Sequence, residues 1–534
     1  MSGIRYSAVI AACIGMSFAA RAQVNPKEKL AQALKAIQEN YVDTMEDERL
    51  TDAAIRGMMK ELDPHSRYFS REESIAMRQS MSGSFVGIGV QFMLEHDSLY
   101  VTQVIPGGPA EKAGLLAGDR ILTIDNEPVT SIPEGNYGIM KKIRGQKGTT
   151  VSLAIQRKLT AGVINKEIER GTIPDRSVKA AYMVNSHTGY ISLGIFNMTT
   201  RTEMDKAIQD LKKQGMESLI LDLQGNGGGL VQAAIGVADE FLQKDQLVFY
   251  SMGKDKGKDY YYSGGFGNFM TGKLVVLIDQ NTASASEILT GALQDWDRAV
   301  VVGRRSFGKG LMQRPVDLFD GSVLELTGAR YYTPSGRSIQ KPYRGADYAD
   351  NVHTRLASGE LTDANVIHFP DSLKYTTLVS KRTVYGGGGI MPDKYVPIDT
   401  TEYAGWLQTV TNGGLVNKVT FDYMDSNRTV LMQQYKDFNS FNKQFTVPAN
   451  LVQEIVTTAE KSGLMLQPRS KDRTLSLLTL DIKGQIAGQL FASNDYYLQV
   501  MNSDNNSYRT ALEILENPAL YAGYLKSAAG VKKK

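Results

Sequence analysis

Ser284 and Lys309 are the residues of this chain whose types and spacing could do nucleophilic chemistry. Ser284 lies between an apolar, strand-like run at 274–278 and a helix-like segment at 286–293. A serine at a strand-to-helix turn is exposed and has backbone N–H groups beside it. Lys309 follows 25 positions later, in a turn flanked by glycines. A lysine held in a dry pocket can lose its proton near neutral pH, so the pair indicates a Ser-Lys hydrolase.

Each of the two residues also has an ordinary structural explanation. A serine before a helix usually caps it, and a lysine in a glycine turn is usually a solvated surface residue. The residue pair alone does not decide between these explanations, so the wider sequence has to.

The composition is that of a folded protein with several domains. The chain has 534 residues, 42% of them hydrophobic, and such a length is typical of about three domains. Its net charge is +3, and the block of basic residues that stands out is the final 532–534 run. Nucleic acid is therefore not an expected partner.

The first 22 residues have the pattern of a secretory signal. Arg5 supplies a positive charge, 6–19 is apolar, and the Ala-Arg-Ala run at 20–22 fits a small-x-small cleavage site. We expect cleavage before Gln23 and export to the periplasm. A membrane anchor is one alternative, although the apolar run is short for a span. Lipoprotein anchoring at Cys13 is another, although the apolar run continues past that residue.

Cys13 is also the single cysteine of the chain. If the signal is removed, the mature protein has no thiol. A disulfide framework, a cysteine nucleophile and a cysteine-based metal site are then excluded. We expect no metal and no cofactor.

The residue pattern divides the chain into parts. Apolar residues recur at helical spacing after the signal, which favours a plain helical bundle, and pairing of their faces between copies of the chain is the alternative. Short strand-like runs with Gly, Pro and Asp turns follow, and then strands alternate with helices as in a layered α/β core. The expected parts are a signal peptide at 1–22, a helical region at 23–82, a β-domain at 83–158, an α/β core at 159–400 and a mainly helical extension at 401–534.

Six runs, in this order, closely resemble those of the carboxyl-terminal processing peptidases, also called tail-specific proteases. They span roughly residues 30 to 400, and the ordered set is more specific than any single run. The runs are Leu-Asp-Pro-His-Ser at 62–66, a PDZ-like run at 106–121, Asp-Leu-Gln-Gly-Asn-Gly-Gly-Gly at 222–229, Thr-Ala-Ser-Ala-Ser-Glu at 282–287, Phe-Gly-Lys-Gly-Leu-Met-Gln at 307–313, and Ala-Arg-Tyr-Tyr-Thr-Pro-Ser-Gly-Arg at 329–337.

The resemblance implies roles for the catalytic residues. Ser284 would be the nucleophile, Lys309 the general base, and Gln313 the residue that orients the lysine. The family spacing of 25 selects Ser284 over Ser286. Asp295 matches an acidic position implicated in some members, although a structural carboxylate at a helix end is an equal alternative.

The glycine-rich run after Leu223 has three interpretations. Gly227 or Gly228, together with Ala285, could donate N–H groups to an oxyanion. The run could instead bind a nucleotide, but it lacks the Lys-Ser/Thr that ends a P-loop. It could also be a tight turn only. The family usually has Arg where this chain has Gln224, so an ion pair expected from that arginine is in doubt; it often has Pro at the position of Gly227.

The run from Phe85 to Val90 resembles the carboxylate-binding loop of PDZ domains. Glycines let successive N–H groups converge on a terminal carboxylate, and the neighbouring strand edge adds the peptide as a further strand. A β-domain that serves only as a spacer is the alternative. The expected peptide-binding residues are Phe85, Gly87, Ile88, Gly89 and Val90.

The resemblance implies a multidomain α/β protein with an N-terminal helical region, a PDZ β-domain, a crotonase-like α/β protease core and a mainly helical C-terminal extension. It would be an exported serine endopeptidase that captures proteins or peptides by their apolar C-termini and cleaves them. A homo-oligomer, through N-terminal or C-terminal helices, and an adaptor protein are candidate assemblies.

Three other functions compete with this one. A PDZ adaptor would bind C-termini without cutting, and an acyl-transferring or CoA-handling enzyme could use the same core. A histidine-based triad would need one of five histidines to meet Ser284 in space. No His-Glu-x-x-His run is present, so a zincin is not expected. The five histidines are His65, His96, His187, His353 and His368.

Overall fold

The computed structural model describes residues 25–95, 98–105, 107–157, 160–343, 348, 351–400 and 405–526. The expected signal segment, Cys13 and His96 lie outside these residues. In the part of the chain that is described, no helix is both long and apolar enough to cross a membrane.

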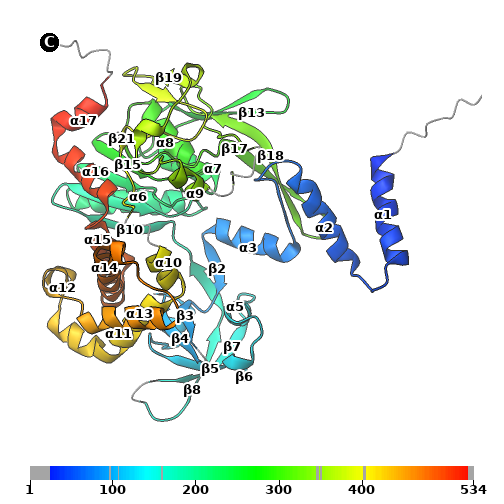
Figure 1. Ribbon diagram of the computed structural model, residues 1–534, viewed down its shortest axis with the longest axis vertical. Coiled ribbons are helices and arrows are strands. Elements are labelled where there is room, and N and C mark those ends of the chain that lie inside the picture. The colour runs from blue at the N-terminus through cyan, green and yellow to red at the C-terminus, as the bar shows by residue number, and fades with distance from the viewer. Residues whose placement is uncertain are drawn as a thin grey trace, which may run out of the picture.

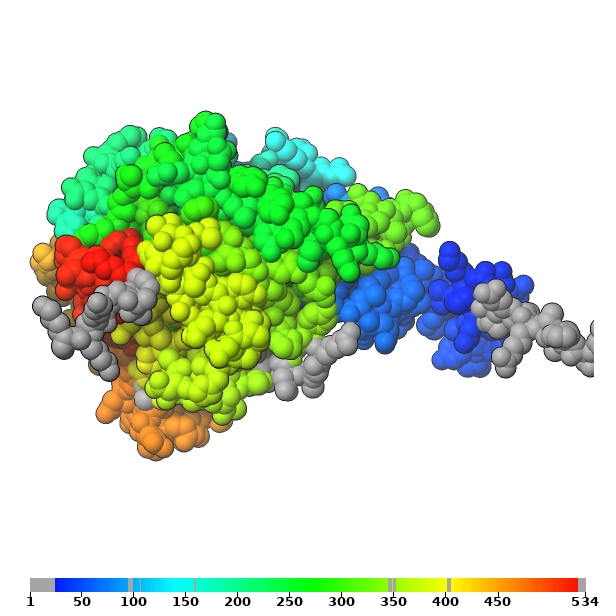
Figure 2. Space-filling model, turned by 90° about the horizontal axis from the view of Figure 1, so that it is seen from above, coloured from blue at the N-terminus to red at the C-terminus, as the bar shows by residue number. Residues whose placement is uncertain are grey.

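The N-terminal region is mainly helical. Its elements are α1 (Pro26–Asn40), α2 (Asp47–Lys60), strand β1 (Arg67–Phe69) and α3 (Arg71–Ser82). Helix α1 stands away from the rest of the molecule, and α1 and α2 project from the body in the space-filling view (Figures 1 and 2). None of the α1 residues is buried, and Leu30 and Ile37 expose about half of their surface, at 51% and 42%. Pairing of this apolar face with a second copy stays a prediction.

A six-stranded sheet forms the centre of the α/β core. Its order is β10-β11-β12-β15-β16-β21, and all neighbours are parallel except β10 and β11. Parallel strands that are covered on both faces read as continuous apolar runs, as in Lys-Leu-Val-Val-Leu-Ile of β15. The strands are β10 (Val178–Met183), β11 (Thr188–Leu193), β12 (Ser218–Asp222), β15 (Lys273–Ile278), β16 (Val300–Gly303) and β21 (Lys394–Tyr395).

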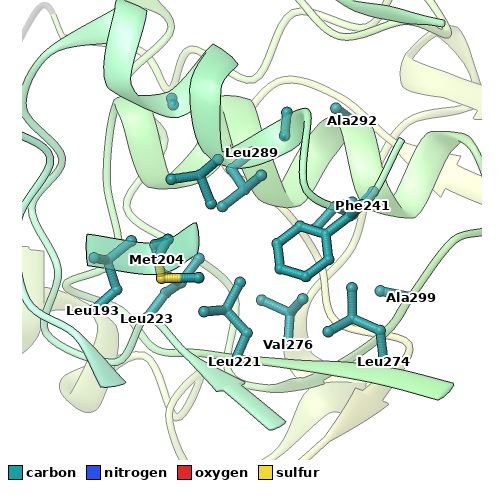
Figure 3. Packing of buried hydrophobic residues seen from close by; sticks show 14 of the residues in the cluster. Leu193, Met204, Leu221, Leu223, Phe241, Leu274, Val276, Leu289, Ala292 and Ala299 are labelled. Carbon is teal, nitrogen blue, oxygen red and sulfur yellow. The ribbon is translucent and has the colours of Figure 1, made fainter. Parts of the chain in front are cut away.

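Three helices cover the first face of this sheet. They are α6 (Thr200–Lys213), α7 (Val231–Ala238) and α8 (Ala285–Asp295). Successive side chains of a strand point to opposite faces. Leu221 and Val276 therefore point from β12 and β15 toward Leu289 of α8, with Phe241 beside them (Figure 3). This packing fixes the start of α8 above the carboxyl ends of the strands.

The opposite face of the sheet is covered by the C-terminal extension. Ile220 and Val275, which alternate with the residues of the first face, pack against Ala511 and Ile514 of α16 (Asn506–Glu516). Helix α17 (Pro518–Tyr524) follows along the same side (Figure 1). The last part of the mainly helical extension therefore completes the core.

A second sheet carries residues of the later motifs. Strand β18 (Val323–Tyr332) pairs with β17 (Leu311–Asp317), with β13 (Leu247–Gly253) and with β1, and β14 (Lys258–Tyr262) extends β13. The N-terminal region therefore contributes a strand to the core. Smaller elements nearby are α9 (Asn351–Ala357), β19 (Lys374–Thr376) and β20 (Thr383–Tyr385).

The PDZ domain has its own sheet and its own core. The sheet order is β3-β4-β5-β7-β8, β6 (Glu127–Pro128) pairs with β5, and α4 (Pro109–Lys112) and α5 (Asn136–Ile143) complete the domain. The sheet continues past the expected boundary at 158, because β8 pairs with β7 from Thr150 to Ile155. The strands are β3 (Val90–Glu95), β4 (Ser98–Val104), β5 (Arg120–Ile124), β7 (Thr150–Gln156) and β8 (Ile164–Glu169).

A two-stranded ribbon joins the PDZ domain to the core. Strand β2 (Ser84–Gly87) pairs antiparallel with β9 (Gly171–Pro174). In the sequence, β2 directly precedes the PDZ sheet and β9 directly follows it. Phe85 and Gly87, expected to bind peptide, therefore lie in this ribbon, where Phe85 faces Ile173 across the pair and its ring lies 4.8 Å from the Arg144 guanidinium.

The remaining helices form a separate apolar cluster beside the PDZ domain. Phe441, Ile455 and Ile482 are fully buried within it. The ring of Phe421 lies 6.0 Å from that of Tyr100 in β4, so this bundle contacts the PDZ sheet. Its helices are α10 (Gly405–Asn412), α11 (Leu415–Gln434), α12 (Phe438–Gln444), α13 (Ala449–Lys461), α14 (Lys471–Leu490) and α15 (Asn494–Asn502).

Candidate active site

Three adjacent parallel strands deliver the candidate catalytic loops to one edge of the core sheet. The glycine-rich run follows β12, the Ser284 turn follows β15, and the Lys309 turn follows β16. Because the carboxyl ends of parallel strands meet at the same edge, residues far apart in sequence converge there. The strands and helices expected around Ser284 and Lys309 are thus present.

Ser284 has a strained backbone at the entrance of α8. Its φ is 58° and its ψ is −117°, a region that residues other than glycine seldom adopt. Such strain costs on the order of 1–3 kcal/mol and persists only where the surroundings enforce it. The turn before it is fixed by Asp279, whose Oδ1 accepts hydrogen bonds from the N–H groups of Thr282 and Gly225. One carboxylate therefore joins the nucleophile turn to the glycine-rich run.

Gly228 packs directly against the nucleophile. A Cβ atom at this position would lie 2.8 Å from Ser284 Cβ and 2.7 Å from the carbonyl oxygen of Ala283, so a larger residue would displace the turn. Ser286, the alternative nucleophile, is fully buried and donates a hydrogen bond to the carbonyl of Asn226. Ser286 thus holds the glycine-rich run in place.

The geometry distinguishes the two candidate oxyanion glycines. The N–H of Gly228 donates to Asn226 Oδ1 at 2.9 Å, so it would have to exchange this partner before it could bind an oxyanion. Among the described residues, the N–H groups of Gly227 and Ala285 have no hydrogen-bond partner. Gly227 is exposed and has open space around it. The geometry favours Gly227 and Ala285 as donors.

Glu287 connects the nucleophile turn to the lysine turn. It is fully buried, and its Oε2 accepts the N–H of Ser284 at 2.9 Å and the N–H of Lys309 at 2.8 Å. Its Oε1 accepts the N–H of Gly308 and the hydroxyl of Ser306. Burial raises the pKa of the carboxyl, and these hydrogen bonds act in the opposite direction. Glu287 belongs to the Thr-Ala-Ser-Ala-Ser-Glu run, but its position in the sequence does not reveal this connecting role.

Tyr331 makes a second connection between the same turns. Its hydroxyl, on β18, is directed at the carbonyls of Lys309 and Ser284, at 2.8 and 3.2 Å. The backbones of both candidate catalytic residues are therefore contacted by the same two side chains, Glu287 at the N–H groups and Tyr331 at the carbonyls. A tyrosine at the end of a strand near a lysine turn was the available signal, but sequence spacing does not reveal such a contact.

Burial lowers the pKa of Lys309 below its usual range. Glu325 acts against this effect, whereas the positive charge of Arg67 supports it. These two side chains form an ion pair with each other at 3.0 Å across β1 and β18. The N-terminal strand therefore contributes to the electrostatics of the candidate base.

Within the described part of the chain, Gln313 forms no side-chain hydrogen bond with Lys309. Its Nε2 donates to Thr327 Oγ1 at 3.3 Å, and that hydroxyl donates to Asp63. Gln313 is thus linked to the Leu-Asp-Pro-His-Ser run through a neighbouring strand. The link from Gln313 therefore leads to Asp63 rather than to the lysine.

His65 lies near Lys309 but not against Ser284. Burial and the nearby lysine charge lower the pKa of His65 to about 4, and its Nε2 is 2.5 Å from the Tyr348 hydroxyl. Among the described residues, no histidine forms a hydrogen bond with Ser284. The geometry gives no support to a histidine-based triad.

Asp295 lies at the far end of α8 from the nucleophile. The helix has 11 residues, which places the two about 16 Å apart along its axis. Asp295 forms a fully buried ion pair with Arg337 at 2.7 Å and accepts the N–H of Ser335. The structural alternative for Asp295 therefore fits its surroundings.

The departure from the family at Gln224 is explained by the C-terminal extension. Gln224 Oε1 accepts a hydrogen bond from Asn505 at 2.9 Å. Asp222, two positions before it, is buried and has no ion-pair partner among the described residues. It accepts a hydrogen bond from the Tyr190 hydroxyl, and burial raises its pKa to about 6. An amide thus occupies the place where the family usually has an arginine.

Four parts of the chain match known protein families. Residues 187–348 match peptidase family S41, 86–165 match a PDZ domain, and 15–73 match the N-terminal domain of the activating protease CtpB. Residues 406–492 match a family of unknown function. The carboxy-terminal-processing protease of Bartonella bacilliformis is 36% identical over 317 residues, which are 58% of this chain and 72% of that protein. The chain belongs to peptidase family S41.

Two further proteins are similar to this chain. The carboxy-terminal processing protease CtpB of Bacillus subtilis is 35% identical over 321 residues, 59% of this chain and 65% of that protein. A solved structure of the photosystem II D1 C-terminal processing protease is 30% identical and covers 59% of this chain and 91% of its own, with a TM-score of 0.34. The expected fold class and the expected class of enzyme, a serine-type peptidase with a PDZ domain, are confirmed.

Replacing Glu287 by Gln should reduce turnover more than substrate binding. Whichever way the amide is turned, at least one N–H of the two catalytic turns then faces an NH₂ group. A lost charged hydrogen bond of this kind is worth about 1.5–3 kcal/mol, so we expect kcat to fall about 10- to 100-fold with little change in KM. Steady-state kinetics on a peptide substrate measure this.

Glu240→Gln is the matched control. Glu240 is a buried carboxylate that accepts the N–H of Asn268, away from the catalytic turns. The Glu240→Gln substitution should leave kcat unchanged. Equal losses in both variants would mean that Glu287 only stabilises the fold.

Proposed function

We propose that this S41 protein is an exported endopeptidase with a Ser284–Lys309 dyad, and that it cleaves proteins whose free C-terminal tails its PDZ domain binds. The dyad is supported by two hydrogen bonds, which Glu287 accepts from the backbone N–H groups of Ser284 and Lys309. They hold the two turns at one place. The buried lysine, whose pKa is lowered, is the kind of group that can act as a base near neutral pH.

The reaction follows from these positions. The neutral amine of Lys309 takes the proton of Ser284 Oγ as that oxygen attacks the scissile carbonyl. The negative charge that develops on the substrate oxygen is stabilised by the N–H groups of Ala285 and Gly227. The lysine then returns the proton to the leaving amine. Water, activated by the same lysine, hydrolyses the acyl-enzyme.

Tail recognition is supported by the loop before β3. Among the described residues, the N–H groups of Ile88 and Gly89 have no hydrogen-bond partner, and φ of Gly89 is +82°. Their carbonyls are occupied by Ala110 and Ile105. Unpaired N–H groups in such a turn suit a terminal carboxylate. Phe85 and Gly87 lie in the β2–β9 ribbon, so they would affect tail binding through that ribbon rather than by binding the carboxylate.

Substitution of either dyad residue should abolish cleavage. With Ser284→Ala or Lys309→Met, we expect kcat on a loosely folded substrate with an apolar tail to fall by at least about 1,000-fold. Mass spectrometry of the products measures this. Ser286→Ala should retain measurable activity, because its hydroxyl only supports the glycine-rich run. Cleavage that survives in Ser284→Ala would identify another nucleophile, and tail binding without cleavage by the unaltered protein would favour a PDZ adaptor.

The pH dependence should report the charge on Lys309. The base must be neutral, so activity rises as pH passes through its pKa. Arg67→Met removes a positive charge that lowers this pKa, so the rising limb should move to higher pH. Glu325→Gln removes a negative charge that raises it, so the limb should move to lower pH. Profiles of kcat/KM measure both, and shifts in the same direction would contradict a lysine base.

Export rests on the first 22 residues. When the full chain is expressed in a bacterial host, the mature protein should begin at Gln23, because the small-x-small run ends at Ala22. Mass spectrometry of the intact protein measures this. Retention of the segment, or a lipid on Cys13, would show a membrane anchor instead.

A further inference from the structure

A cavity lined by carboxamide side chains lies between the PDZ domain and the C-terminal helices. Its volume is about 470 Å³, and none of the residues that line it carries a formal charge. Eight of them are asparagine or glutamine, including Gln91 and Asn136 of the PDZ domain and Asn417 and Gln489 of the bundle. Such a wall offers both donors and acceptors but no counter-ion.

The cavity follows the free edge of β3. Within the described residues, β3 pairs with β4 and with no other strand. Gln91 and three further residues of β3 line the cavity, and the loop with the unpaired N–H groups of Ile88 and Gly89 lies just before the strand. An extended peptide whose carboxylate occupies this loop would continue along this edge.

The alternation of β3 divides such a peptide into two sets of side chains. Phe92 and Leu94 pack against the PDZ core, so Met93 between them points to the opposite side. Gln91 is exposed and precedes these residues at an irregularity in the pairing with β4. A peptide strand paired with β3 alternates in the same way. If the last side chain of the peptide points into the PDZ core, the alternation directs its second- and fourth-from-last side chains toward the bundle.

A carboxamide oxygen in the wall of the cavity lacks a hydrogen-bond donor. Among the described residues, Gln489 Oε1 is buried and accepts no hydrogen bond. A buried acceptor in this state costs about 1–3 kcal/mol. A ligand with an N–H or O–H group would satisfy it.

The bundle is held firmly beside β3. Gly118 of the PDZ domain approaches Asp425 of α11 so closely that a Cβ atom would lie 2.8 Å from the carboxylate. On the core side, Asn494 donates to the carbonyl of Lys179, and Asp495 accepts the N–H of Ala181. The helical wall of the cavity is therefore positioned by both neighbouring domains.

We propose that the C-terminal helical extension forms a second wall of the tail-binding groove. It selects tails with uncharged hydrogen-bonding side chains, namely Ser, Thr, Asn or Gln, at the second- and fourth-from-last positions. A charged side chain there would lose hydration without gaining a counter-ion. The inference rests on the proposed tail recognition and adds a specificity that a PDZ domain alone would lack.

The test uses the full chain with Ser284→Ala, so that peptides are bound but not cut. Fluorescent peptides of about ten residues share an apolar last residue and carry either Asn or Ala at the two alternate positions. We expect the Asn peptide to bind about tenfold more tightly, and Asn417→Ala or Gln489→Ala to remove most of this difference. Fluorescence anisotropy measures the affinities.

Gln433→Ala is the matched control, since Gln433 is exposed on the same helix α11 as Asn417 but does not line the cavity. It should bind both peptides as the parent does. Equal affinity for the Asn and Ala peptides, or wall variants that keep the preference, would overturn the inference while tail binding stands. If an amidated C-terminus binds as well as a free one, the proposed tail recognition itself fails, and this inference fails with it.

Discussion

The carboxylate of Glu287 is the constraint on which the catalytic arrangement depends. A buried carboxylate is tolerated only when its oxygens are well supplied with donors, and here four donors from two turns provide them. Two of these donors are the N–H groups of the candidate nucleophile and base. The requirement to satisfy one buried charge therefore fixes the relative position of two residues that are 25 apart in sequence.

The sheet explains how those turns come together. Strands β12, β15 and β16 are parallel neighbours, so their carboxyl ends present the glycine-rich run, Ser284 and Lys309 at one edge. Helices α6, α7 and α8 on one face and α16 on the other bury the apolar side chains of these strands. The C-terminal extension is thus part of the core, and its Asn505 meets Gln224 where the family usually has an arginine.

The N-terminal region and the PDZ domain are each connected to the core by a strand pairing. Strand β1 brings Arg67 beside Glu325 and so influences the charge on Lys309, while the ribbon of β2 and β9 ties the PDZ domain to the core. The helical bundle in turn lines the free edge of β3. The surfaces proposed for peptide capture and for peptide cleavage are therefore connected through paired strands.

The sequence by itself determined the domain types, the strand and helix around Ser284, and the identity of the catalytic candidates, because these depend on local periodicity and on ordered motifs. Tertiary structure alone decided which N–H groups of the glycine-rich run are free, that Asp295 pairs with Arg337, and that Glu287 and Tyr331 bind both turns. It also extended the PDZ sheet to β8 and placed α16 on the core. These features arise from contacts between residues distant in the chain, whose donors, acceptors and charges are paired only after the strands are aligned.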